Sequence, residues 1–197
     1  SWDTLPVFWF SANESALEGP SGQALMAKFP IAILAWQTDV KGAPAWRHSE
    51  EKMRRQAAEL KLSAPHTSVL AYIQGQLVEP WYDSQWKLMP PPCGNDTTGI
   101  YSDYFLMDNH TGVTRPAEWP SPDKAGGCEW MWNYDHSKET VREYFLNEVV
   151  LPVASIDNMF GVWFDSSDFL PCTGMGPYNM PGFNNMTISP RDSVARE

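Results

Sequence analysis

The fold is decided by the stretch WNYDHSKETVREYFLNEVVLPVASIDNMFGVWFDSSDF, residues 132–169, in which a helix pattern is followed at once by a strand pattern. We predict a helix over residues 138–150, capped by Ser137, because apolar side chains recur there every three or four residues. Its apolar stripe consists of Val141, Phe145 and Val149, with Tyr144 and Leu151 close to it. Pro152 should stop or kink this helix, because proline lacks an N–H and crowds the preceding turn. The apolar run at residues 160–164 then predicts a buried strand.

Three further apolar runs precede this stretch and are continuous rather than alternating, as expected for strands buried on both faces of a parallel sheet. They occupy residues 7–10, 31–36 and 68–73. Helix patterns separate them, over residues 22–28 and 49–60. Strands that alternate with helices pair in parallel through right-handed crossovers. The sequence therefore predicts an α/β fold with a parallel sheet.

The clearest helix pattern is that of residues 49–60. Ser49 can cap this helix, and Glu50 and Glu51 suit the positive end of its dipole. One face of the helix, which we expect to be buried, is formed by Met53, Ala57 and Leu60. Two ion pairs are expected on the outer side, Glu50 with Arg54 and Glu51 with Arg55.

A long excursion over residues 74–133 separates the third predicted strand from the deciding stretch. It is rich in proline, glycine, tryptophan and aspartate, and it holds one strand-like piece, at residues 101–107. An excursion of this length in a compact domain usually carries function or decoration. The sequence predicts a single domain over residues 1–197. The pattern at residues 189–197 looks like the start of another capped helix, which indicates a domain that is incomplete at its C-terminal end.

The composition narrows the possible partners. The chain has 197 residues, of which 43% are hydrophobic and 19% are charged, so it has enough apolar content to form a core. A formal net charge of -10 disfavours nucleic acid, because phosphate contacts need clustered lysine and arginine. No run approaches the roughly 18 apolar residues of a membrane-spanning helix. We therefore expect neither nucleic-acid binding nor a membrane span.

Glycosylation sequons and cysteines favour the secretory pathway. Four Asn-x-Ser/Thr sequons lie in polar, loop-like stretches, at Asn13, Asn95, Asn109 and Asn185, although so short a pattern also recurs by chance. Three cysteines lie in Gly/Pro-rich segments, which suits disulfides between loops: Cys93, Cys128 and Cys172. Because their number is odd, one of them is left to pair with another chain or with a segment absent from this one. No spacing matches a metal site, and nothing implies a cofactor. We expect a secreted or lumenal glycoprotein.

The deciding stretch resembles a pattern of glycoside-hydrolase-like (β/α) barrels. In those families an Asp or Asn precedes a helix that reads x-Val-Arg-x-Tyr, and a strand that begins with Gly and ends with Asp follows. The matching residues are Asp135, then Val141, Arg142 and Tyr144, then Gly161 and Asp165. The resemblance implies a parallel-sheet (β/α) barrel of the TIM type, with about the first four of its eight βα units in this chain.

The resemblance also implies that Asp165 ends the fourth barrel strand, where related families place a nucleophile or a charge-stabilising carboxylate. A carboxylate at this end of a parallel strand faces the mouth of the sheet, where barrel active sites lie. The alternative is that Asp165 only caps the turn that follows it. Glycoside hydrolysis needs a second carboxyl group. The possible second carboxyl groups are those of Asp135, Asp168 and Glu79. Asp135 is preferred, although an acidic residue at this position could instead start the helix or bind a sugar hydroxyl.

Ten tryptophans are many for one chain, and carbohydrate sites stack flat indole rings on sugar rings. Four of them lie at expected strand ends or in the excursion and are candidates for substrate stacking: Trp36, Trp81, Trp132 and Trp163. Trp36 is preferred because it ends the second strand next to polar residues. For any single tryptophan, a place in the core is the alternative.

We therefore expect a carbohydrate-active enzyme, a glycoside hydrolase of the retaining or inverting type, with Asp165 as nucleophile or base and carbohydrate as its partner. The alternative is a non-catalytic glycoprotein that uses the barrel for glycan binding or for assembly with other subunits. Four βα units leave open sheet edges, which another chain or a missing C-terminal segment would have to cover. An open α/β domain for another small ligand is disfavoured, because no Gly-rich phosphate loop follows a strand.

Overall fold

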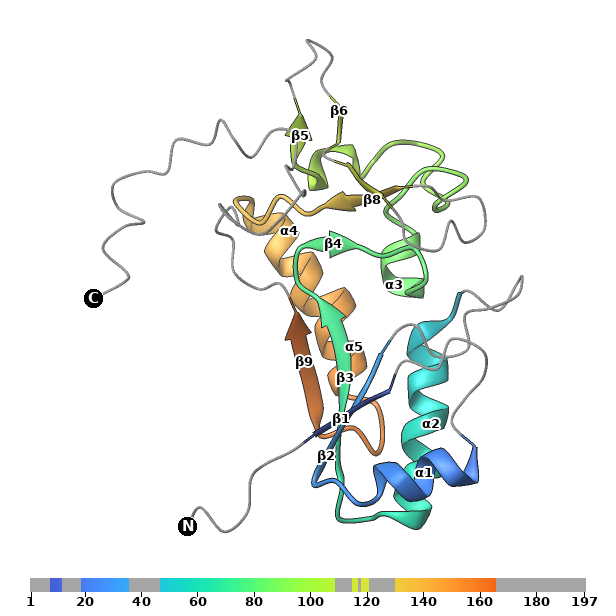
Figure 1. Ribbon diagram of the computed structural model, residues 1–197. Coiled ribbons are helices and arrows are strands. Elements are labelled where there is room, and N and C mark those ends of the chain that lie inside the picture. Colours follow the sequence, from blue (N-terminus) through green and yellow to red (C-terminus); the bar gives the residue numbers. More distant parts are fainter. Residues whose placement is uncertain are drawn as a thin grey trace, which may run out of the picture.

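The main sheet contains four parallel strands, which correspond to the four predicted ones (Figure 1). The computed structural model describes residues 8–11, 19–35, 47–108, 115–116, 118–120 and 130–165. The strands are β1 (Phe8–Ser11), β2 (Ile31–Leu34), β3 (Ser68–Gln74) and β9 (Gly161–Asp165), in that order across the sheet. Every neighbouring pair is parallel. The prediction of an α/β fold is therefore confirmed.

Helices cover one face of this sheet. The strands follow one another across the sheet without a reversal of order, so right-handed crossovers place the connecting helices on the same side. Helix α1 (Pro20–Met26), predicted at residues 22–28, packs on helix α2 (Ser49–Ser63). Ala32, Val69 and Ala71 share a buried cluster with the inner side of α2. In the described part of the chain the sheet is open, with β1 and β9 at its edges, and it does not form a closed barrel.

Helix α2 buries the face that its sequence predicted, but it begins differently. Met53, Ala57 and Leu60 are fully buried, as expected. The cap position is occupied by His48, whose backbone is in the left-handed conformation with φ 68° and whose side chain does not cap the helix. Ser49, the predicted cap, lies inside the first turn and is buried. The prediction of a serine cap is therefore wrong.

The charged pairs on α2 also differ from the prediction. Arg54 pairs with Glu51, three residues away, with 2.6 Å between Nη2 and Oε1. Glu50 turns instead toward the short helix α3 (Asp83–Trp86), where it accepts hydrogen bonds from backbone N–H groups. The first N–H groups of a helix have no partner within it, so a carboxylate gains more there than from an exposed guanidinium.

The helix predicted over residues 138–150 is present, but its winding changes along its length. It consists of α4 (Glu139–Tyr144), a π-helical segment η3 (Phe145–Val150) and α5 (Leu151–Ala154). Pro152 does not stop it, because the wider π turn relieves the crowding that a proline ring causes in an α-helix. The π turn also shifts the buried stripe to Val149, Val150 and Val153. Leu151 is therefore 47% exposed, contrary to the prediction.

The excursion between β3 and α4 folds into a small antiparallel layer beyond the carboxyl end of β3 (Figure 1). Its sheet contains β4 (Leu77–Val78), β8 (Trp130–Asn133) and β7 (Glu118–Pro120), with β8 in the middle, and a separate pair contains β5 (Met107–Asp108) and β6 (Arg115–Pro116). A second buried cluster is formed by Val78, Leu88, Met89, Phe105, Tyr134 and Val141. Because Val141 belongs to α4, this cluster fastens the layer to the α/β part.

The prediction of a strand over residues 101–107 is wrong. Most of this piece is not extended, since it contains the short 3-10 helix η1 (Ser102–Tyr104), and only Met107 lies in a strand. The rings of Tyr101 and Tyr104 pack edge to face with their centroids 5.2 Å apart, and both pack on Tyr144 of α4. Tertiary packing of the aromatic rings thus outweighs the strand-like local pattern.

Asp96 organises the turn that leads into η1. Its carboxylate accepts hydrogen bonds of 2.8–3.1 Å from the N–H groups of Thr98, Gly99 and Tyr101 and from the Thr98 hydroxyl. Burial alone would raise the pKa of Asp96, but these donors together outweigh it and lower the pKa below its usual value. The turn is therefore stabilised by the ionised form of Asp96.

Replacing Asp96 by alanine is expected to lower the free energy of unfolding by about 2–3 kcal/mol at neutral pH, because the donors lose a charged acceptor. A lowered pKa adds stability above the usual carboxyl pKa, and this stability is lost as the pH falls through the lowered value. The difference between wild type and Asp96→Ala should therefore shrink in acid. Urea denaturation over a pH series measures it, with the exposed Asp103→Ala as control. A difference that does not change with pH would contradict this account.

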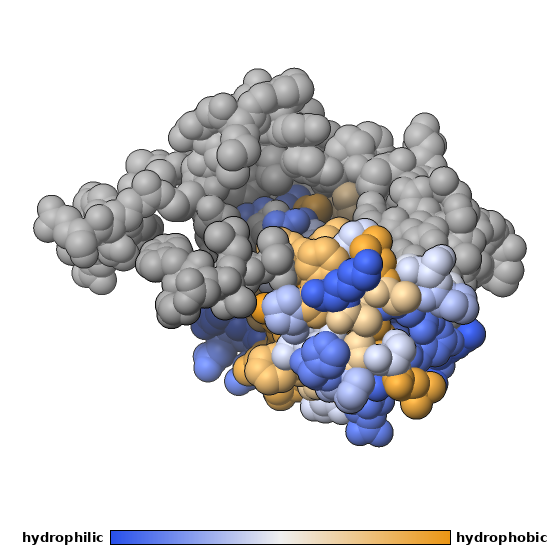
Figure 2. Space-filling model, turned by 60° about the horizontal axis from the view of Figure 1, so that its bottom comes forward, coloured by the Kyte–Doolittle hydropathy of each residue, from blue (hydrophilic) through white to orange (hydrophobic). Residues whose placement is uncertain are grey.

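The end of the molecule at which the strands begin has a mixed surface. Seen from that end, apolar and polar side chains are interspersed (Figure 2). Leu62, near the end of α2, and Phe160, just before β9, are among the exposed apolar side chains. Scattered apolar residues of this kind are ordinary on protein surfaces. Of the helices in the described ranges, none combines the length and the apolar character needed to cross a bilayer.

Candidate functional site

The candidate site lies where β3 and β9 end, at the carboxyl edge of the parallel sheet (Figure 1). Gln74 and Asp165, the last residues of the two strands, are register neighbours. The backbone N–H of Gly75 donates to the backbone oxygen of Asp165 at 2.9 Å. The Tyr72 hydroxyl donates to Oδ2 of the Asp165 carboxylate at 2.7 Å. Both the backbone and the carboxylate of Asp165 are therefore held in place at the strand end.

A second carboxyl group, that of Glu79, lies close to this strand end. Glu79 directly follows β4, which only two residues separate from β3, and its side chain is buried, with the residue 3% exposed. Burial raises the pKa of Glu79 well above its usual value, the negative charge of Asp165 raises it further, and the nearby Trp81 indole offsets part of the rise. The Glu79 side chain therefore favours its neutral, protonated form.

Around these strand ends, several buried polar atoms have no hydrogen-bond partner among the described residues. Oε2 of Glu79 makes no hydrogen bond to any described residue. The same holds, within the described ranges, for Oε1 of Gln74, Nε2 of Gln85 and the hydroxyl of Tyr134. Folded proteins leave few buried polar atoms unsatisfied. The cluster can therefore offer hydrogen-bonding groups to a molecule that enters it.

Tyr72 acts as a fixed hydrogen-bond donor in this cluster. Burial raises its pKa, and the hydrogen bond to Asp165 and the negative charge of that carboxylate raise it further. The backbone oxygen of Tyr72 accepts a hydrogen bond of 2.5 Å from the hydroxyl of Tyr82, which is itself fully buried. Tyr72 therefore stays protonated at neutral pH, and its hydroxyl orients one oxygen of Asp165.

Aromatic rings line the sheet face that lies opposite the described helices. Side chains alternate between the two faces of a strand, and the ring contacts show that Phe10, Tyr72 and Trp163 share one face. The Tyr72 and Trp163 centroids are 5.6 Å apart, and Phe10 meets both rings edge-on at 5.8 and 6.3 Å. Phe8 and Phe10 are 52% and 40% exposed. Asp165, two residues after Trp163, lies on this same face.

Asp135, the preferred second carboxylate, occupies the start of α4. Its Oδ1 accepts hydrogen bonds from the Ser137 hydroxyl at 2.5 Å and from the Ser137 N–H at 3.2 Å, and Oδ2 lies 3.5 Å from Nζ of Lys138. The cap position of α4 is Lys138, not Ser137 as predicted, because the Ser137 hydroxyl is directed to Asp135. These contacts match the helix-start role that was the alternative for Asp135.

The four candidate tryptophans have different surroundings. Trp163 lies on the aromatic face described above. Trp81 is 1% exposed and belongs to the main buried cluster, which leaves no ring face for a sugar. Trp132 packs edge-on against Phe105 with the centroids 4.7 Å apart, so it supports the second cluster. Trp36 lies outside the described residues, as does Asp168 among the candidate acids.

One sequon and one cysteine fall within the described residues. Asn95 is exposed in the loop that follows α3. Cys93 of the same loop is disulfide-bonded. The other sequons and cysteines lie outside the described residues: Asn13, Asn109, Asn185, Cys128 and Cys172.

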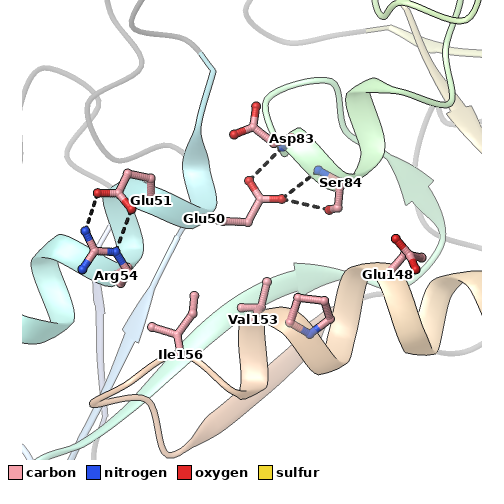
Figure 3. Close-up of a pocket in the computed structure, with 9 residues that line it drawn as sticks. Glu50, Glu51, Arg54, Asp83, Ser84, Glu148, Val153 and Ile156 are labelled. Atoms are coloured by element: carbon pink, nitrogen blue, oxygen red, sulfur yellow. Dashed lines mark hydrogen bonds and ion pairs between the residues drawn. The ribbon is translucent and has the colours of Figure 1, made fainter.

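A cleft on the helical side is the other candidate (Figure 3). It has a volume of about 270 Å³ and lies between α2, α3 and the η3–α5 segment, with Val153 and Ile156 along its apolar wall. Its carboxylates are already engaged: Glu50 with Asp83 and Ser84, Glu51 with Arg54, Asp83 with Arg47 and His48, and Glu148 with Lys87. The cleft is thus a junction between helices rather than a reactive site.

Replacing Glu50 by glutamine is expected to lower the free energy of unfolding by about 1–2 kcal/mol, because the carboxylate accepts three hydrogen bonds, of 2.8–3.0 Å, at the start of α3. Glu51→Gln is the matched control, since the exposed Glu51 pair should contribute little. Urea denaturation at neutral pH measures both variants. Equal effects of the two substitutions would show that the junction does not depend on Glu50.

In the part of the chain that the structure describes, no group of three or more His, Cys, Asp or Glu side chains is arranged to hold a metal ion. The sequence matches no protein-family model, and the comparison with curated proteins gives no match. The fold alone defines the class of the protein. It is an α/β protein with a parallel sheet and a carboxylate at the sheet's carboxyl edge.

Proposed function

We propose that the protein is a carbohydrate-active enzyme of the glycoside-hydrolase type, with Asp165 as the carboxylate that acts as nucleophile or base. The observation that carries this proposal is the position of Asp165. It ends a parallel strand, on the face opposite the helices, and the Tyr72 hydroxyl orients its carboxylate. In (β/α) enzymes the reacting groups lie at this edge of the sheet.

The aromatic face beside Asp165 supports a sugar as the substrate. Sugar rings present C–H groups on their flat faces, and these pack well on aromatic rings. Phe10 and Trp163 provide such rings next to the carboxylate, and Phe8 extends the exposed apolar surface along β1. A neutral pyranose fits this combination of rings and one carboxylate better than an anionic ligand, because the chain carries a net charge of -10.

We further propose that the open sheet is part of a TIM-type barrel, with about four βα units in this chain and the remainder supplied by another chain or by a further C-terminal segment. Two observations support this. The strands run in sequence order with the helices on one face, as in a barrel. Aromatic side chains occupy the other face, which would become the barrel interior.

A secreted or lumenal location remains our proposal for the compartment. Disulfides persist in oxidising compartments, and Cys93 is disulfide-bonded. The sequon at Asn95 is exposed on a loop, where a glycan can be attached. Mass spectrometry of protein from a secretory host, before and after deglycosylation, tests for the glycan at Asn95.

A non-catalytic glycan-binding or assembly role is the second candidate. It is favoured by the burial of Glu79, which limits the access of a substrate to a second carboxyl group. It is also favoured by the edges at β1 and β9, which no strand of the described residues covers. The test is to incubate the full chain with oligosaccharides and aryl glycosides and to measure the release of reducing ends. Hydrolysis of any of them supports the enzyme. Saturable glycan binding without hydrolysis would show that the protein binds glycans and does not cleave them.

A further inference from the structure

We infer that Glu79 is the acid partner of Asp165: Glu79 holds the proton that passes to the leaving oxygen, while Asp165 provides the negative charge. This inference rests on the proposed function, because it assigns the second carboxyl group of the same reaction. It also replaces Asp135, which the sequence pattern favoured for that role.

Few residues separate Glu79 from the end of β3, which is the register neighbour of Asp165. The chain leaves β3 at Gln74, makes a two-residue turn and enters β4, and Glu79 follows immediately. The turn is tied to Asp165 by the hydrogen bond from the Gly75 N–H. The backbone N–H of Glu79 donates to Oε1 of Gln85 at 2.6 Å, which fixes the residue on the side of α3. Glu79 is therefore positioned by the same turn as the end of β3.

The surroundings of Glu79 suit a carboxyl group that keeps its proton. The residue is 3% exposed, and within the described ranges no cation is among the groups that act on its carboxyl. A buried carboxylate without a positive partner is costly, and the nearby charge of Asp165 adds repulsion. Oε2, which has no partner in the described ranges, is free to carry the proton and to donate it. Two carboxyl groups in unequal surroundings are the arrangement that acid–base hydrolysis requires.

The contacts of Asp135 do not suit this role. Its carboxylate accepts two hydrogen bonds from Ser137 and lies beside Lys138. Both of its oxygens are therefore engaged at the start of α4. Oε2 of Glu79, by contrast, has no partner in the described ranges.

The reaction balances with these two groups alone. The glycosidic C–O bond breaks, and the leaving oxygen takes the proton of Glu79. A water molecule adds to the anomeric carbon, either directly, with its proton going to Asp165, or after a covalent intermediate on Asp165, with its proton returning to Glu79. Because Glu79 is buried, the transfer runs through one water or follows a local movement of the cluster, and general acids act by both routes.

The first test is the leaving-group dependence of Glu79→Gln, which keeps the shape of a neutral glutamic acid and leaves Asp165 intact. With alkyl glycosides, whose leaving oxygen needs a proton, we expect kcat to fall on the order of 10²-fold. With aryl glycosides of acidic phenols we expect a fall of less than about tenfold, since those leaving groups depart without a proton. Glu143→Gln, an exposed position on α4, is the matched control. An equal fall with both substrates, or none, would overturn the inference.

A second test does not depend on activity. Infrared difference spectra of wild type against Glu79→Gln should show the band of a protonated carboxyl at neutral pH. In the Asp165→Asn background the same band should disappear at a lower pH, because the repelling charge is gone. A missing band at neutral pH would overturn the inference even if glycosides are hydrolysed. If no glycoside is hydrolysed, the proposed function fails, and the infrared titration still decides whether Glu79 keeps its proton beside Asp165.

Discussion

Replacing Asp165 by asparagine is expected to lower kcat for glycoside hydrolysis by about 10³- to 10⁴-fold, because an amide can neither attack the anomeric carbon nor accept a proton from water. The amide oxygen can still accept the hydrogen bond from the Tyr72 hydroxyl, so the variant should fold. Glycan binding should change much less than kcat, because the neighbouring aromatic rings are unaltered. Initial rates and binding titrations with the same substrate separate the two effects.

Asp157→Asn is the matched control for this experiment. Asp157 is exposed and lies in the turn before β9, at the opposite end of the strand from Asp165. The control makes the same chemical change and should retain full activity. If Asp165→Asn keeps more than about a tenth of the wild-type rate, Asp165 is not the reacting carboxylate, since groups that act in the chemical step contribute far more.

Gly94→Ala is expected to give the largest loss of stability, about 3 kcal/mol or more, because a Cβ at this position would overlap backbone rather than movable side chains. The overlapping atoms are the backbone oxygens of Trp86 and Met89. Both oxygens are held in place, since they accept hydrogen bonds from the N–H groups of Asn95 and Asp96 at 3.3 and 2.9 Å. The loop cannot move away without losing these bonds.

Thermal unfolding measures the effect of Gly94→Ala. For a chain of this size the loss should lower Tm by about 6–12 °C. Gly19→Ala is the control, because a Cβ at Gly19 has nothing within 4 Å and its φ is −74°, which suits alanine. Similar melting temperatures for the two variants would mean that the loop adjusts at little cost.

The sequence predicts the sheet well because the signals for its strands are local. Continuous apolar runs mark β1, β2, β3 and β9, and the inner face of α2 follows from the spacing of its apolar residues. Helix details were less predictable. The π segment before Pro152 and the turn of Glu50 toward α3 depend on neighbours that are distant in sequence. Local patterns do not contain this information.

The candidate site was predictable only in part, for a similar reason. Asp165 was recognisable because a strand-end carboxylate has a clear sequence pattern. Of the possible partner acids the sequence favours Asp135, because the family pattern that it resembles also has an acidic or amide residue at that position, whereas the burial of Glu79 depends on how the excursion folds. The signal that was available is the short distance along the chain from the end of β3 to Glu79, across one glycine turn.

The hydrogen bond between Tyr72 and Asp165 joins residues that are 93 positions apart, and this separation has a consequence for the order of folding. Contacts between distant residues form slowly, because closing a long loop costs entropy before the contact stabilises anything. The first three strands and their two helices can assemble through contacts between residues that are close in sequence. Strand β9 can pair with β3 only by closing a loop that contains the whole excursion. We therefore expect the first three strands to pair before β9 brings Asp165 to the edge of the sheet, so that the candidate site forms after the rest of the sheet.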